Sequence, residues 1–141
     1  MRDEWRVHVS DDQFLASFER CTLAGDSFHH ADHVRVAFLY LCRYPALEAI
    51  QRLSASLARF AAANGKPDRY NETITWALLL LIRERMVRAG GQPNWAEFAA
   101  RNTDLLSWEN NILKNYYRDE TLSSDLAKTC FLFPDKAIAL P

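Results

Sequence analysis

The fold of this chain is decided by residues 28–43, which read FHHADHVRVAFLYLCR. From Val34 to Leu41, apolar side chains recur at the i, i+3, i+4, i+7 spacing of a helix with one buried face. The stretch therefore predicts a helix over residues 30–43 that packs into a core. It also places three histidines at the start of that helix.

The remainder of the chain has the same helical character, and no alternating stretch is long enough to predict a strand. We expect an all-α, single-domain bundle of about five to seven helices over residues 1–141. Residues 72–88 are apolar on nearly every side in their first half, which is typical of a central helix. Further helices are expected over residues 11–23, 45–64, 95–101, 108–118 and 124–130, with Ser10, Asn71 and Asn94 as N-caps.

Composition excludes several classes of protein. The net charge of −1 provides no basic surface for nucleic acid. The longest apolar run, residues 76–82, is far shorter than the roughly 20 residues of a membrane span, and the charged N-terminus does not resemble a signal peptide. Three widely spaced cysteines, Cys21, Cys42 and Cys130, are interpreted as reduced, buried thiols. These features predict a cytoplasmic protein without nucleic-acid or membrane partners.

Two polar clusters are expected to meet at one end of the bundle. His29 and His33 are four residues apart and His30 and His33 three apart, so each pair lies about one turn apart on a helical face. Short connections make successive helices antiparallel neighbours, and two reversals make helices 30–43 and 72–88 parallel. The histidines should then lie close to Tyr70 and Glu72, at the start of the second of these helices.

This arrangement favours a metal site that acts on a small molecule. The positive field of a helix N-terminus keeps imidazole neutral, and neutral imidazole is the form that binds metal. The leading hypothesis makes His29, His33 and Glu72 ligands of a divalent ion, either Zn, Fe, Mn or Cu. The predicted catalytic residues are His30, His33, Tyr70 and Glu72, with His30 or Tyr70 assisting in acid–base steps. The reaction would be metal-assisted hydrolysis or oxidation, so the hypothesis favours an enzyme.

Two alternatives stay open. In a metal-free enzyme, His33 would be the general acid or base and Glu72 would orient it through a hydrogen bond. In a non-catalytic binding module, which could be a homodimer, exposed aromatic residues of helix 108–118 would supply the contact. The residues of that surface would be Trp108, Tyr116 and Tyr117.

Each site residue also has a purely structural interpretation. The histidines could cap their helix and contact solvent, and Glu72 could be a favourable acid in the first helical turn. Tyr70 could pack as a hydrophobic staple. Ser124 and Asp125 are most simply explained as caps of the last helix.

Three motifs resemble a family of small bacterial proteins of uncharacterised function. They are FHHADHVR at residues 28–35, YNETIT at 70–75 and ETLSSDLA at 120–127, and the resemblance extends from about Phe28 to Asp135. It implies that His29, His33 and Glu72 correspond to that family's polar cluster. The family's second motif usually reads Tyr-His-Glu-Thr, and here Asn71 replaces the histidine. If that histidine is a ligand in relatives, the metal site here is altered or absent, although an amide oxygen could still coordinate.

Overall fold

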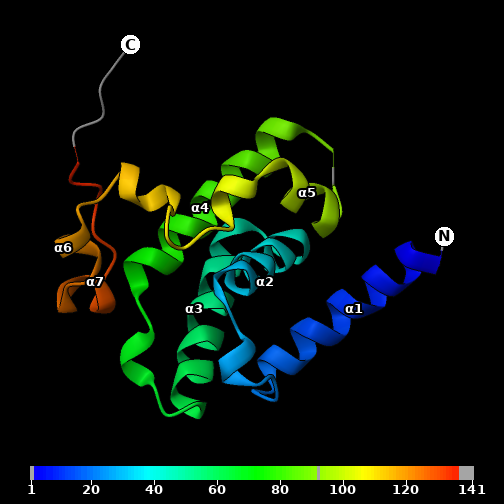
Figure 1. Cartoon of the computed structure of the whole chain (residues 1–141), viewed down its shortest axis with the longest axis horizontal. Coiled ribbons are helices and arrows are strands. Elements are labelled where there is room, and N and C mark those ends of the chain that lie inside the picture. Colours follow the sequence, from blue (N-terminus) through cyan, green and yellow to red (C-terminus); the bar gives the residue numbers. More distant parts are fainter. Residues whose placement is uncertain (1, 92, 137–141) are drawn as a thin grey trace.

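The architecture is that of a helical bundle. The structure, a computed structural model, describes residues 2–91 and 93–136, with their side chains from residue 11 onward. This part of the chain contains seven α-helices and no strand (Figure 1), which confirms the predicted all-α bundle of five to seven helices. The α-helices are α1 (Arg2–Glu19), α2 (His30–Arg43), α3 (Ala46–Ala63), α4 (Glu72–Ala89), α5 (Trp95–Arg101), α6 (Asp119–Leu122) and α7 (Asp125–Thr129). The 3-10 helices are η1 (Gly25–Ser27), η2 (Pro67–Arg69), η3 (Thr103–Leu105) and η4 (Ile112–Asn115).

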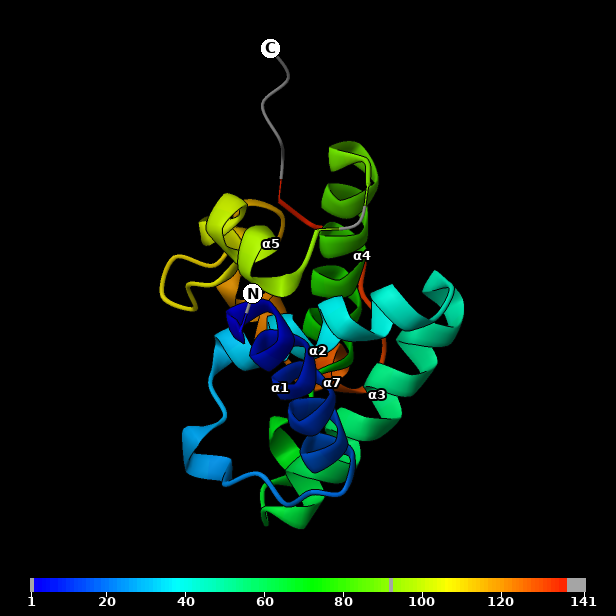
Figure 2. The ribbon, with the colours of Figure 1, turned by 90° about the vertical axis from the view of Figure 1, so that its right-hand side faces the viewer.

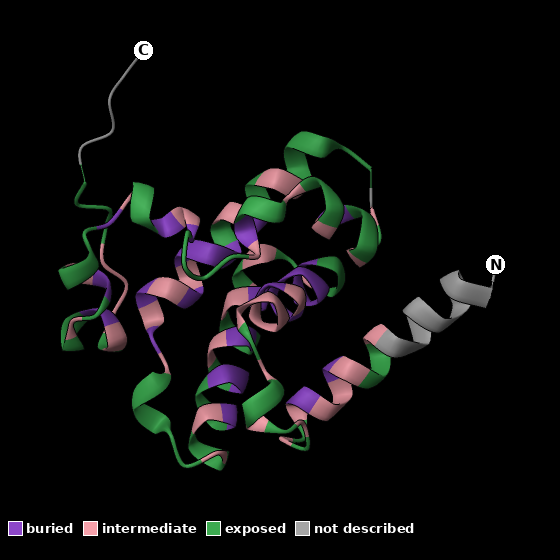
Figure 3. Ribbon diagram, in the orientation of Figure 1, coloured by how far each residue is buried: buried purple, intermediate pink, exposed green. Residues whose placement is uncertain are grey.

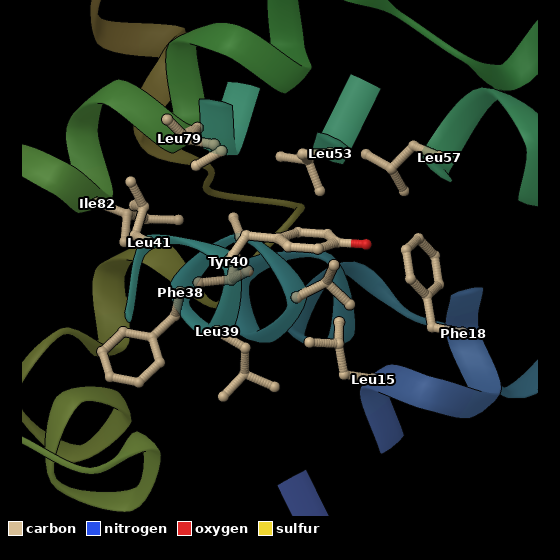
Figure 4. Packing of buried hydrophobic residues seen from close by; sticks show 14 of the residues in the cluster. Leu15, Phe18, Phe38, Leu39, Tyr40, Leu41, Leu53, Leu57, Leu79 and Ile82 are labelled. Atoms are coloured by element: carbon tan, nitrogen blue, oxygen red, sulfur yellow. The ribbon is translucent and has the colours of Figure 1, made fainter. Parts of the chain in front are cut away.

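α2 lies at the centre of the main core. Val34 and all six residues from 36 to 41 are buried. Figure 4 shows the reason, because apolar side chains of α1, α3 and α4 surround α2. Val36, Leu39 and Tyr40 widen the buried face beyond the i, i+3, i+4, i+7 positions, so this helix is enclosed nearly all round. The surrounding side chains are Leu15 and Phe18 from α1, Leu53 and Leu57 from α3, and Leu79 and Ile82 from α4.

α4 connects the main core to a second apolar cluster. Leu79 and Ile82 belong to the main core, whereas Ala77 and Leu78 pack into the second cluster. Because its apolar residues point in both directions, α4 is central in the way its continuous apolar run predicts. The second cluster is completed by Leu113, Tyr117 and Leu122 from the C-terminal part of the chain.

The C-terminal segment is attached to α4 through one buried hydroxyl. Thr73, which is 0% exposed, donates from Oγ1 to the carbonyl oxygen of Cys130 at 2.8 Å. Oγ1 of Thr73 also accepts a hydrogen bond from the backbone N–H of Leu132 at 3.0 Å. These bonds hold Leu132 against α4, although Phe133 is 83% exposed.

The outer elements cover opposite sides of the bundle. In Figure 1, α1 lies to the right of α2 and α3, and α6 and α7 lie to the left. In Figure 2, turned by 90°, α1 is in front and α7 lies behind it.

Helix boundaries agree with the sequence where caps and apolar spacing coincide. α2 and α5 have the predicted bounds, and Asn71 and Asn94 accept hydrogen bonds from the first turns of α4 and α5. The first helix begins at Arg2, so Ser10 lies inside it and is not its N-cap. The predicted helix over residues 108–118 is wrong. Asn111 accepts from the N–H of Leu113 and donates to the carbonyl of Trp108, and such local bonds compete with a helix.

Figure 3 shows buried residues on the faces where α2, α3 and α4 meet, and exposed residues on the outer faces. None of the described helices combines the length and the apolar content that a membrane crossing requires.

The three cysteines are free thiols. Cys21 and Cys130 are half-buried, but Cys42 is exposed, which corrects the expectation that all three are buried.

Candidate functional site

A cavity of about 1410 Å³ opens at the N-terminal ends of α2 and α4. His29, His30 and His33 line it from α2, and Tyr70 and Asn71 line it from the start of α4. Two helix reversals predict this meeting of the two helix starts. The volume exceeds the range of about 300–1,000 Å³ that is common for small-molecule sites. The cavity is thus a broad groove that a small ligand would fill only in part.

His29 occupies the edge of this cavity. It is the N-cap of α2, and its backbone N–H donates to the carboxylate of Asp32 at 2.9 Å. Asp32 therefore stabilises the free N–H end of the helix, as an acid in the first turn commonly does. The side chain of His29 is exposed.

His30 has a tautomer fixed by its surroundings. Its Nε2 lies 3.0 Å from the carbonyl oxygen of Leu105, and a carbonyl can only accept, so Nε2 carries the hydrogen. Burial lowers the pKa of His30, and the hydrogen bond to Leu105 opposes this only in part. The neutral ring therefore presents a bare lone pair at Nδ1. Trp108 packs against this ring with 5.2 Å between the ring centroids.

His33 is held in the neutral form one turn further along α2. Burial, followed by the nearby His30, lowers the pKa of His33 to about 4. Its ring packs against Phe28, with 4.7 Å between the ring centroids. In the described part of the chain, no buried side-chain nitrogen or oxygen lacks a partner, and the ring of His33 has no hydrogen bond to protein. The ring nitrogens of His33 are therefore open to the cavity.

Tyr70 and Glu72 form a pair of their own. The hydroxyl of Tyr70 donates to the carboxylate of Glu72. Burial, and then this hydrogen bond, raise the pKa of Tyr70 to about 12, so the phenol stays protonated. Tyr70 lines the cavity, whereas Glu72 is not among the residues that line it.

The predicted metal ligands are therefore not assembled around one point. The described residues contain no group of three or more His, Cys, Asp or Glu side chains placed to hold a metal ion. Within the same residues, no hydrogen bond or ion pair joins His33 to Glu72, and the hydrogen bond of Glu72 goes to Tyr70. The expected meeting of the histidines with the start of α4 is found, but with Tyr70 and Asn71 rather than with Glu72.

Both polar atoms of the Asn71 side chain form hydrogen bonds within the fold. Its Oδ1 accepts from the N–H of Ile74 at 2.9 Å and caps α4, and its Nδ2 donates to the carbonyl of Leu122 at 2.7 Å. The residue is 9% exposed. Asn71 therefore joins the start of α4 to the end of α6, and its amide oxygen is already occupied by the helix cap.

Residues 105–111 contribute to the surroundings of His30, which the sequence did not predict. This irregular segment supplies the carbonyl of Leu105 and the ring of Trp108, both of which contact His30. The wrongly predicted helix also defined the proposed dimer surface. Tyr117 is 2% exposed and packs in the second apolar cluster, so the three aromatic residues do not form one exposed face.

The C-terminal motif at residues 120–127 caps α7 and contributes a residue to the cavity wall. Ser124 accepts from the N–H of Ala127 at 3.1 Å and caps α7, as the structural interpretation expects. Ser123 lines the cavity, and its hydroxyl donates to the carbonyl of Asp119 at 3.0 Å. Asp125 lines a separate, smaller hollow with Lys128.

Comparison with known protein families, with curated proteins and with solved structures finds no match to this chain. Functional inference therefore rests on the geometry and chemistry of the cavity.

Proposed function

We propose that the protein binds a small organic molecule in the cavity at the starts of α2 and α4, and that His33 makes the polar contact to it. The observation that carries this proposal is the neutral, half-buried imidazole of His33, whose ring nitrogens open into the cavity beside Phe28. A ligand that covers His33 would bury its ring nitrogens, so it must hydrogen-bond to them to avoid the cost of an unpaired polar group.

The same contact is suited to acid–base chemistry. A neutral imidazole can accept a proton at one nitrogen and donate a hydrogen bond from the other. This corresponds to the metal-free alternative, with one change. His30, rather than Glu72, is the polar neighbour of His33, because Glu72 is bound by Tyr70.

Nuclear magnetic resonance of the histidine ring nitrogens tests the proposal. A library of small neutral organic molecules is screened against the full chain, and hits are titrated against wild type, His33→Phe and His29→Gln. We expect hits that shift the ring nitrogens of His33, that lose affinity in His33→Phe, and that bind His29→Gln as they bind wild type. Hits that bind His33→Phe unchanged, or a library without hits, would refute the proposal.

A divalent metal ion is the second candidate, because neutral imidazole is the form that binds metal. His33 and the Nδ1 atom of His30 would supply ligands, with His29 at the edge of the cavity. Glu72 would have to leave Tyr70 before it could take part.

Equilibrium dialysis of tag-free protein against Zn²⁺ or Cu²⁺ tests the metal hypothesis. The metal hypothesis predicts that wild type retains one equivalent of metal and that His33→Phe retains none. Equal retention by both proteins would place the metal elsewhere.

We also propose a cytoplasmic location, which the three free cysteines support.

A further inference from the structure

Most polar groups around the cavity are already used by the fold. Asn71 and Asn111 each cap a helix with the amide oxygen and donate to a backbone carbonyl with the amide nitrogen. Thr75 donates to the carbonyl of Asn71 at 2.7 Å, and Tyr70 donates to Glu72. A ligand could recruit these groups only by breaking bonds that hold helix ends in place.

Three of the four groups that remain free offer an acceptor, and the fourth, Lys128, offers only donors. Among the half-buried cavity residues, those that keep an open nitrogen or oxygen in the described structure are His30, His33, Asn64 and Lys128. His30 presents the lone pair of Nδ1, and Asn64 presents its amide oxygen because its nitrogen donates to a backbone carbonyl at 2.9 Å. Neutral His33 adds one lone pair and one N–H. A ligand that satisfies these acceptors must carry an O–H or N–H group.

The charges around the cavity favour a neutral ligand. Four basic and four acidic side chains lie on its wall, and all of them are exposed except Lys128, which is half-exposed. Their opposite charges give the wall no preference for an anion or a cation. In addition, the burial that keeps His33 neutral would also penalise an ammonium group placed beside that ring.

Aromatic rings flank both imidazoles. Trp108 lies against His30 with centroids 5.2 Å apart, and Phe28 lies against His33 at 4.7 Å and against Phe60 at 4.7 Å. Trp108 is 49% exposed, so a large apolar ring remains uncovered where the cavity opens. Aromatic pairs gain from stacked or edge-to-face contact beyond the area that they bury. A flat aromatic ligand fits these walls better than a puckered aliphatic one.

We infer that the ligand is a neutral, planar aromatic molecule with an O–H or N–H group, which packs against Trp108 and Phe28 and donates to His30 or His33. This inference rests on the proposed function, since it specifies the ligand of the same cavity.

Five probes of similar size separate the parts of this inference. Phenol has the ring, the donor and no charge at neutral pH, whereas toluene lacks the donor, cyclohexanol lacks the flat ring, and benzoate and benzylamine carry charge. Each is titrated into the full chain at neutral pH, and dissociation constants are obtained from amide and histidine-ring chemical shifts. Phenol is also titrated into Trp108→Ala and into Phe133→Ala. Phe133 is an exposed ring outside the cavity and serves as the matched control.

We expect phenol to bind most tightly and toluene to bind about threefold to tenfold more weakly, the effect of one net hydrogen bond. Trp108→Ala should weaken phenol binding, and Phe133→Ala should leave it unchanged. Equal binding of toluene or cyclohexanol, or tighter binding of a charged probe, would overturn the ligand class while leaving a small-molecule site in place. If no probe shifts the resonances of His33, and the neutral library also gives no hits, the proposed function itself fails.

Discussion

Replacing His33 with phenylalanine should remove a loss of stability that the wild-type protein suffers in acid. Burial, with a contribution from His30, lowers the pKa of His33 from 6.5 to about 4 in the folded chain. In the unfolded chain the ring is solvated and titrates near 6.5. Phenylalanine keeps a flat ring against Phe28, where the centroids are 4.7 Å apart, and cannot take up a proton.

The sign and size of the effect follow from proton linkage. Between pH 6.5 and about 4, the unfolded chain binds a proton at His33 and the folded chain does not, so the free energy of unfolding falls as the pH falls. The full stability is present above pH 6.5, and the loss is complete below about pH 4. Integrating over this window gives a loss of about 2–3 kcal/mol by about pH 4.5.

Urea denaturation followed by circular dichroism, from about pH 7 to about pH 4.5, measures this effect. The difference in unfolding free energy between His33→Phe and wild type should shift by about 2–3 kcal/mol in favour of the variant. Contributions of carboxylates common to both proteins cancel. Phe133→Ala is the control, because its exposed ring does not titrate, and its difference from wild type should stay constant. A constant difference for His33→Phe as well would refute the conclusion that burial holds this imidazole neutral.

Three substitutions, each measured by urea denaturation, test hydrogen bonds or close contacts within the fold. Asn71→Ala should cost about 2 kcal/mol, since it removes a helix cap and leaves the carbonyl of Leu122 without its donor, and Asn71→Asp should recover about half by restoring the cap. Gly25→Ala would place a Cβ atom 2.4 Å from Oδ1 and 2.8 Å from Cγ of Asn64, which should cost about 1 kcal/mol. Adding Asn64→Ala should abolish that extra cost, and an unchanged cost would contradict the clash. Tyr40→Phe should cost about 1–2 kcal/mol, because the buried hydroxyl lies 2.8 Å from a carboxylate and 3.0 Å from a serine hydroxyl; full stability of this variant would show that the bonds are not needed.

The helical fold could be predicted because several local signals agree. For α2 the apolar spacing, the acid in the first turn and the following proline all indicate the same helix, and the bounds are correct. Asn71 and Asn94 were identified as caps because an amide side chain before an apolar run can accept from the third residue on. The prediction failed over residues 108–118, where Asn111 forms its bonds locally and stops a helix.

The site was predictable in its location and less so in its partners. Helix direction follows from short connections and predicts that the histidines lie near Tyr70 and Glu72, and of these two Tyr70 lines the same cavity. The direction of the Glu72 side chain was not predictable, because it depends on the hydroxyl of Tyr70, two residues away. Trp108 and the carbonyl of Leu105 belong to an irregular segment without periodic spacing, and only the folded chain brings them to His30.

The double role of the Thr73 hydroxyl has a consequence for local opening. The N–H of Leu132 donates to this oxygen, so it is shielded from solvent exchange only while the C-terminal segment is docked. The amide of Ile82, inside α4, is protected by the helix and by the main core. Deuterium uptake at Leu132 therefore reports release of the C-terminal segment, and uptake at Ile82 reports unfolding of the bundle. The ratio of the two rates measures how independently the segment leaves α4.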